Sequence, residues 1–222
     1  MIKIDFHTHT HFSYDCVMLP EKILKIAKNK GLTHIVINDH NSIQGGLACQ
    51  ALSRKYDIEV IVGSEIKTDI GDVTGIFLKE EIEPGPYLDV LENIKKQGGL
   101  SILNHPFVGH KLSGLNFEAF DLIEGYNGRC NSEQNKMAVE LAEKHNKPFI
   151  SGSDAHTYAE IGNNYSLYND FSDVRQPTDN IYNKAHAIHK VYSQFIKSFK
   201  KKDPALFLNV LLGAPKKIIQ NR

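Results

Sequence analysis

The sequence predicts an α/β protein built as a (β/α) barrel. Through the first 160 residues, apolar runs of strand length alternate with segments of helical period, a pattern typical of βα units repeated around a parallel sheet. Many of the apolar runs are followed immediately by histidine, aspartate or glutamate, whose side chains can bind metals. Because catalytic residues of (β/α) barrels collect at the carboxyl ends of the strands, a barrel explains this recurrence better than an open sheet does.

The strands are predicted from short apolar runs, several of them bounded by glycine, proline or other turn residues. In chain order they are 2–6, 34–37, 58–62, 73–78, 100–103, 122–126 and 148–151. No sequence repeat is visible beyond the alternation of strands and helices.

The helices between these strands are predicted from apolar residues spaced to form one face. In chain order they are 20–29, 42–56, 87–97 and 132–145. Pro20 lies in the opening turn of the first helix and Gly31 lies just past its end, which is the arrangement that helices favour. Ser42 can cap the second helix, and the turn at 84–86 precedes the third.

After about residue 158 the alternation gives way to a polar loop. Two helix-like stretches, at 180–201 and 205–212, finish the chain. We expect residues 1–160 to form the barrel, and residues 161–222 to form a loop and helices packed on it as an appendage.

Composition and charge exclude several classes of function. The chain has 26 Lys and Arg against 26 Asp and Glu, so no overall field attracts nucleic acid or an anionic membrane. Its three cysteines are widely spaced, which fits a reducing cytoplasm better than a disulfide framework. No run approaches the roughly 20 apolar residues that span a bilayer, and no signal-like stretch opens the chain. We expect a soluble cytoplasmic protein with no membrane partner.

Six predicted strand ends carry residues that could bind a metal ion. Imidazole and carboxylate groups are preferred ligands of Zn, Mn and Fe. His7 and His9 alternate along a strand and therefore face the same side, as chelation requires. The six segments are His7-Thr8-His9, Asp39-His40, Glu65, His105, Glu124 and Asp154-Ala155-His156. Together they indicate one polynuclear metal site.

Five motifs, taken together and in this order, resemble the PHP (polymerase and histidinol phosphatase) family. They are Asp5-Phe6-His7-Thr8-His9, Asn38-Asp39-His40, Gly63-Ser64-Glu65, Asn104-His105-Pro106 and Gly152-Ser153-Asp154-Ala155-His156. The resemblance implies a distorted seven-stranded (β/α) barrel with two or three divalent metal ions at its carboxyl rim. It also implies hydrolysis of phosphoesters.

Carried over residue by residue, the resemblance implies up to three ion sites. One ion would be bound by His7, His9, Glu65 and Asp154. The second would share Glu65 and add His105. The third would be bound by Asp15, His40 and His156, with His11 competing with Asp15 for the loop position.

The resemblance is weaker at the second ion. In the family this ion is usually bound by a further histidine after the strand equivalent to 122–126. This chain has no histidine there before His145, inside a predicted helix. Glu124, Asn127 or Cys130 would have to replace the missing ligand, or one ion is absent.

The chemistry that such a cluster implies is attack on phosphorus by a metal-activated hydroxide, since water shared by two cations loses much of its proton affinity. Asp39 could orient the His40 imidazole or the attacking water. Arg129 is a nearby cation whose planar fork suits a phosphate. We therefore predict a phosphatase of small phosphomonoesters.

Three other readings stay open. The first is a 3'-5' or 5'-3' nuclease or nucleotidase acting on short oligonucleotides or bisphosphorylated nucleotides, in which Tyr14 or Phe107 could stack a base. The second is a non-catalytic metal-stabilised scaffold, which so many charged groups at one rim argue against. The third is an amidohydrolase, which is weakened by the lack of an evident strand-end lysine. The sequence does not predict an oligomeric state.

Overall fold

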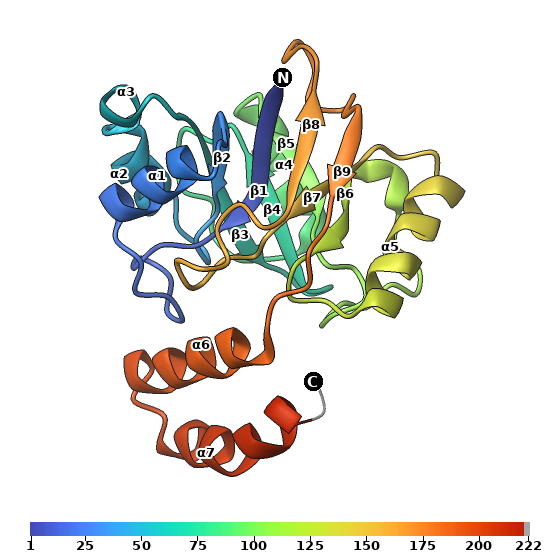
Figure 1. The fold of residues 1–222 in the computed structure, drawn as a ribbon. Helices are drawn as coiled ribbons and strands as arrows, with labels where there is room; N and C mark the ends of the chain where they lie inside the picture. Colours follow the sequence, from blue (N-terminus) through green and yellow to red (C-terminus); the bar gives the residue numbers. More distant parts are fainter. Residues whose placement is uncertain (220–222) are drawn as a thin grey trace.

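A computed structural model of the chain describes residues 1–219 and shows nine strands in one sheet that curls into a nearly closed barrel (Figure 1). The sheet order is β7-β6-β5-β4-β3-β2-β1-β8-β9. The strands are β1 Ile2–Thr8, β2 His34–Ile37, β3 Glu59–Lys67, β4 Asp72–Ile76, β5 Leu100–Leu103, β6 Leu122–Asn127, β7 Phe149–Gly152, β8 Tyr165–Tyr168 and β9 Asp179–Ile181. This architecture confirms the predicted α/β barrel.

Helices cover the outside of the barrel and one of its ends (Figure 1). They are α1 Pro20–Asn29, α2 Gln44–Gln50, α3 Ser53–Tyr56, α4 Tyr87–Lys96, α5 Ser132–Lys144, α6 Ala187–Lys200 and α7 Pro204–Ile219, with a 3-10 turn at Phe117–Ala119. The segment predicted as one helix at 42–56 is two short helices, α2 and α3. Among the described residues, no helix has both the length and the apolar character needed to cross a membrane.

The barrel closes where the segment after β7 meets β1. The backbone N–H of His9 donates to the Ala155 carbonyl over 3.0 Å, and the Ala155 N–H donates to the His7 carbonyl over 3.1 Å. The buried Asp5 carboxylate accepts hydrogen bonds from the N–H groups of Ser153 and Gly162, each at 2.9 Å. These bonds hold the ends of β1 and β7 side by side.

Strand β4 runs antiparallel to both β3 and β5, where the alternating pattern predicted a parallel sheet. The link from β3 to β4 is the turn at 68–71, in which the Thr68 N–H donates to the Gly71 carbonyl over 2.9 Å. A turn this short can join only antiparallel strands, because a parallel connection needs a crossover of a dozen or more residues. The amino end of β4 therefore lies at the rim where its neighbours end.

Strand β8 occupies a segment expected to be loop, so the count is nine rather than seven. Strand β9 overlaps the start of the helix predicted at 180–201, which in the structure begins only at Ala187. Both are short and partly polar, and antiparallel pairing holds β8 on β1 and β9 on β8. Ser166 of β8 accepts from the Ser151 N–H at 3.0 Å and donates to Asn180 Oδ1 at 2.6 Å. Such strands carry no apolar run that a sequence pattern could detect. The division of the chain near residue 160 stays a prediction.

Apolar side chains fill the interior of the barrel, nearly every strand contributing. This interior cluster comprises Ile4, Phe6, Val36, Ile61, Ile76, Ile102, Leu122, Ile150, Tyr168 and Val174. Two further clusters lie between the sheet and its helices. Because side chains alternate along a strand, the same strands supply the interior and the outer layers.

Candidate metal centre

The side chains expected to hold the first ion are together at the rim where β1, β3 and β7 end. The imidazole Nε2 of His9 lies 3.4 Å from Glu65 Oε2 and 3.4 Å from Asp154 Oδ1. Nε2 of His7 lies 3.6 Å and 3.8 Å from the same two oxygens. The structure thus brings four predicted ligands from three separate segments into one group.

The other ring nitrogen of each histidine is held by a neighbouring side chain. His7 Nδ1 lies 2.9 Å from Glu124 Oε1, and His9 Nδ1 lies 3.0 Å from Ser13 Oγ. Because a carboxylate can only accept, Nδ1 of His7 carries the proton when the ring is neutral, and Nε2 then has a free lone pair. A carboxylate behind a histidine in this way is common where histidine binds a metal.

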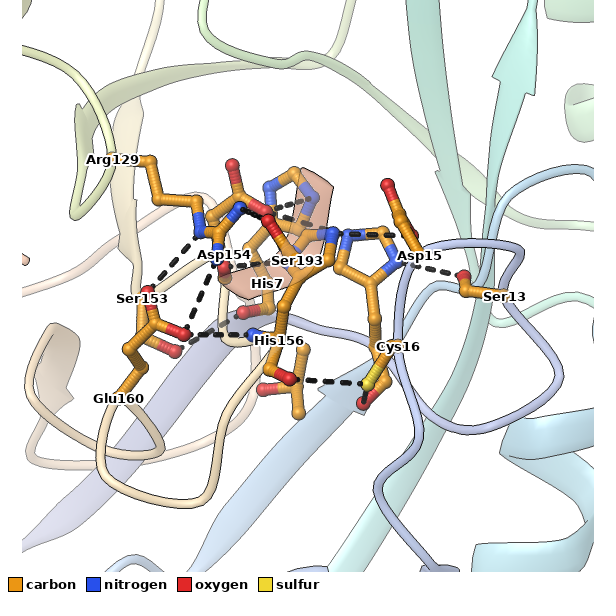
Figure 2. Close-up of polar contacts among 12 residues, drawn as sticks. His7, Ser13, Asp15, Cys16, Arg129, Ser153, Asp154, His156, Glu160 and Ser193 are labelled. Atoms are coloured by element: carbon orange, nitrogen blue, oxygen red, sulfur yellow. Dashed lines mark hydrogen bonds and ion pairs between the residues drawn. The ribbon is translucent and has the colours of Figure 1, made fainter. Parts of the chain in front are cut away.

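A second group lies beside the first and matches the predicted third site. His40 Nε2 is 3.3 Å from Asp15 Oδ2. His156 Nε2 is 3.3 Å from Asp15 Oδ1 (Figure 2). His156 Nδ1 lies 2.9 Å from the backbone oxygen of Asp154, which orients its ring. His9 belongs to this group as well, since its ring contacts that of His156 at 4.2 Å between centroids. The two groups therefore share the His9 side chain.

The surroundings of His105 differ from those of the two groups above. The carboxylate oxygens near it already accept hydrogen bonds from side-chain amides. His105 Nε2 lies 3.0 Å from Glu65 Oε1, but Asn104 Nδ2 donates to that same oxygen over 2.6 Å. Asn127 Nδ2 donates to Glu124 Oε2 at 3.0 Å and to Asp154 Oδ2 at 3.2 Å. In its present position Asn127 offers these oxygens N–H groups and not a ligand atom.

Cys130, the other proposed replacement ligand, is buried and has a free thiol. Burial raises the pKa of this thiol, and the charge of Glu124 adds to the rise. The thiol belongs to none of the groups of potential ligands among the described residues.

Burial and neighbouring charge set the protonation of the histidines. Burial, together with the nearby charge of His156, lowers the pKa of His9 to about 3, so His9 is neutral. For His40, burial opposes protonation, but the charges of Glu65 and Asp15 outweigh it and raise the pKa to about 9. A metal ion bound through His40 would have to displace a proton, which makes binding stronger at higher pH.

Two predicted ligands lie at strained backbone positions. His105 has a φ of 30° and Asp154 a φ of 51°, in the left-handed region that non-glycine residues rarely adopt. Beside them, a Cβ added to Gly152 would lie 2.5 Å from His7 Cβ and 2.6 Å from Glu124 Oε1. Strain and close approach of this kind cluster at functional sites.

Asp39, expected to orient His40 or a water, is placed differently. Its carboxylate accepts from the Thr10 N–H and the Thr10 hydroxyl, both at 2.6 Å. Instead, the His40 ring contacts the carboxylates of Asp15 and Glu65. Asp39 therefore fixes the loop after β1, which carries Ser13 and Asp15.

Arg129, expected to bind a substrate phosphate, has its guanidinium turned to protein partners (Figure 2). Its Nε and one terminal nitrogen donate to the two oxygens of Glu160, at 3.2 and 3.4 Å. Its other donors reach Ser193 Oγ at 2.9 Å and the His189 carbonyl at 3.2 Å, both on α6. In this structure Arg129 ties α6 to the rim.

The sequence did not predict the place of two rim residues beside the ligand groups. Asp72, at the start of β4, forms a third group of potential ligands with His40 and Glu65. Its position depends on the antiparallel direction of β4, which the alternating pattern did not reveal. Tyr14 stacks on His40 with 4.4 Å between ring centroids and 5° between planes. The sequence singled it out as a base-stacking side chain but not as the cover of a metal-ligating histidine.

The residues present fit divalent cations. Within these groups of potential ligands, three buried atoms make no hydrogen bond to the described residues: His7 Nε2, His9 Nε2 and Asp15 Oδ1. An unpartnered buried polar atom costs on the order of 1–3 kcal/mol, so three together need an explanation. Each faces other nitrogen or oxygen ligand atoms, the donor set that Zn, Mn and Fe accept.

Comparison by sequence finds one family and two relatives. The profile of the PHP domain matches residues 5–206. The uncharacterized protein MJ1587 of Methanocaldococcus jannaschii is 36% identical over 163 residues, which cover 64% of this chain and 95% of that protein. The uncharacterized protein MJ0417 of the same organism is 31% identical over 191 residues, covering 80% and 75%.

Comparison by structure finds the same fold at low sequence identity. A Bifidobacterium adolescentis protein, named for an expected metal-dependent phosphoesterase activity, has a TM-score of 0.57 at 16% identity and covers 70% of this chain and 88% of its own. PsfC from Pseudomonas syringae has a TM-score of 0.61 at 14% identity, with 90% and 98% covered. An amidohydrolase from Chromobacterium violaceum, with bound sulfate and no metal, has a TM-score of 0.62 at 14% identity, with 72% and 89% covered.

Proposed function

The chain belongs to the PHP domain family, and from this membership and the rim geometry we propose that it is a metal-dependent phosphatase of small phosphomonoesters. The family match and the histidine and carboxylate groups both support a metal-dependent hydrolase. The observation that carries the proposal is the convergence of buried ligand atoms of His7, His9 and Asp15 that make no hydrogen bond to the described residues.

The ion sites follow from the two groups at the rim. One cation would be held by His7, His9, Glu65 and Asp154. Another would be held by Asp15, His40 and His156, with His9 and Asp72 at its edge.

We expect two cations and not three. On the His105 side, the amides of Asn104 and Asn127 already donate to the carboxylate oxygens that a further ion would need. An N–H group in that position satisfies the oxygen and leaves it with little reason to bind a cation.

Cations bound there would polarise a phosphoryl oxygen and lower the pKa of water. The chain's own residues supply a fixed arrangement around them. Glu124 holds the ring of His7 and Ser13 that of His9, so Nε2 of each ring stays directed at the carboxylates. Tyr14 covers one face of His40 and keeps water from it. Preorganisation of this kind lowers the cost of reaching the reacting geometry.

A small substrate is favoured over a polymer by the position of α6. This helix lies across the end of the barrel at which β1 ends (Figure 1). Its contacts with Arg129 and with the loop after β1 hold it there. A helix fixed across the rim restricts the approach of a long strand more than that of a small phosphomonoester.

The test is a metal analysis of the purified protein, coupled to phosphate release from a panel of phosphorylated metabolites. We expect about two equivalents of transition metal and phosphate release that is lost in His7→Ala. Asp173→Asn, which changes a carboxylate outside these ligand groups, is the control and should match the parent protein. A protein that stays folded but releases no phosphate under any metal would favour the scaffold. Cleavage of oligonucleotides in preference to monoesters would favour the nuclease.

A further inference from the structure

Charge is distributed very unevenly along this neutral chain. Residues 184–222 contain nine Lys and Arg but only one acidic residue, Asp203. The rest of the chain consequently has an excess of acidic residues. The basic segment includes α6, which lies across the rim, and α7, which packs on α6 (Figure 1).

Helix α6 is fixed across the rim at both of its ends. Near its first turns, Ser193 and the His189 carbonyl accept from Arg129, which Glu160 holds in turn (Figure 2). At its last residue, the Lys200 ammonium donates to the carbonyls of His11 and Ser13, at 2.6 and 2.7 Å. The second anchor is on the loop that carries Asp15. The face of α6 that holds these contacts is therefore turned toward the candidate metal centre.

Two further ammonium groups lie against Tyr14, on this loop. Lys201 Nζ is 3.9 Å from the centre of the Tyr14 ring and Lys197 Nζ is 4.9 Å from it. The same ring stacks on His40, a proposed metal ligand. Among the described residues, neither ammonium group has a carboxylate within ion-pair distance. Two cationic groups thus lie one aromatic ring away from the metal centre and have no acidic partner.

We propose that Lys197 and Lys201 form a subsite for a second anionic group on the substrate. The subsite rests on the proposed phosphatase function and specifies it: the preferred substrate is a phosphomonoester that also carries a phosphate or a carboxylate. The ester phosphate would be held at the rim while the second anion reaches past the edge of Tyr14 to the two lysines. Lys197 is half-buried and Lys201 is exposed, so an anion can reach both ammonium groups from the solvent.

The kinetic test compares three substrates on the metal-loaded full chain: fructose 1,6-bisphosphate, 3-phosphoglycerate and glycerol 1-phosphate. In Lys197→Ala/Lys201→Ala we expect KM to rise at least about tenfold for the two substrates with a second anion, and to change less than about twofold for glycerol 1-phosphate. A loss confined to fructose 1,6-bisphosphate identifies the second group as phosphate, and one confined to 3-phosphoglycerate identifies it as carboxylate. An equal effect on all three substrates overturns the subsite.

The matched control removes the same amount of charge elsewhere. Lys136→Ala/Lys144→Ala, on the exposed face of α5, should leave the preference among the three substrates unchanged. If the alanine variant at the subsite fails to fold, Lys197→Gln/Lys201→Gln removes the charges and keeps most of the length of the side chains. If the α5 variant lost its preference for substrates with a second anion to the same extent, the effect would be one of net charge and the proposal would be wrong.

A binding measurement separates failure of the subsite from failure of the phosphatase assignment. 3-Phosphonopropionate and propylphosphonate cannot be hydrolysed as esters, and only the first has a second anionic group. By calorimetry, the parent protein should bind 3-phosphonopropionate at least about tenfold more tightly, and the subsite variant should bind the two equally. Equal binding by the parent overturns the subsite even if phosphate is released. Preferential binding without phosphate release from any ester keeps the subsite and overturns the phosphatase.

Discussion

The rim and the interior of the barrel lie a few residues apart on the same strands, yet opposite kinds of side chain fill them. On β1, Ile4 and Phe6 pack in the apolar interior, and His7 follows them at the rim. On β3, Ile61 lies in the interior and Glu65 at the rim. Both regions are buried, so burial alone does not distinguish them.

The two regions differ in whether burial is favourable for the atoms that are buried. Apolar side chains in the interior gain free energy from leaving water, about 1.5–3 kcal/mol for each fully buried large side chain. At the rim, ligand atoms of His7, His9 and Asp15 are buried without hydrogen-bond partners, which is unfavourable until something binds them. The interior therefore stabilises the fold, and it supports a rim whose arrangement serves binding. Changes in the two regions should have separable effects.

The largest expected effect is at the rim. Asp154→Asn removes the charge of a carboxylate that faces both His7 and His9, and should lower kcat/KM roughly 10³-fold, because metal-assisted stabilisation is worth several kcal/mol. The measurement is phosphate release together with metal content. The circular dichroism spectrum should stay that of the parent. Full activity and full metal content in this variant would show that the rim residues do not bind the catalytic metal.

The matching change in the interior should act on stability and leave the chemistry intact. Ile76→Ala creates a cavity in the interior cluster and should lower the free energy of unfolding by about 2–5 kcal/mol, whereas Ile76→Val should lower it by about 0.5–1.5 kcal/mol. Urea unfolding measures both. At a temperature where each variant is folded, kcat/KM should lie within about twofold of the parent. If Ile76→Val abolished activity while folded, the proposed separation of the two regions would be wrong.

A smaller effect is expected at Glu124, which holds the proposed ligand His7 but is not itself one of the proposed ligands. Glu124→Gln keeps the size of the side chain but weakens its hold on His7 Nδ1, and should reduce metal affinity about 10–100-fold. Competition with a chelator measures this affinity. Glu133→Gln, on the exposed first turn of α5, is the control. An unchanged affinity in the Glu124 variant would mean that the orientation of His7 is set by other contacts.

The smallest effect is a pH dependence at His34, which begins β2 at the end away from the rim. Burial lowers the pKa of His34, although Glu59 partly opposes this. A base with a lowered pKa in the folded state contributes its stability above the unfolded pKa of about 6.5, and that contribution is lost as the pH falls below it. The fall in Tm between pH 7.5 and pH 5 should therefore be smaller in His34→Gln than in the parent. An equal fall would show that His34 does not contribute.

The sequence by itself predicted the barrel, the family and most residues of the candidate centre. His7 and His9 are two apart on a strand, so local geometry alone places them on one side. Glu65, Asp154 and His156 follow other apolar runs, and in a barrel the ends of parallel strands meet at one rim. These predictions need only the local period of the chain and the architecture that the period implies.

Only the tertiary structure decided how the remaining groups are used. The antiparallel direction of β4 brings Asp72 to the rim, and the polar strands β8 and β9 depend on pairing with β1. Arg129 turns to Glu160 and α6, and Asn127 directs its amide N–H at the carboxylates. Each of these outcomes joins residues far apart in the chain, through hydrogen bonds or register. Local periodicity carries no information about such pairings, because they are selected by the competition among all donors and acceptors when the fold closes.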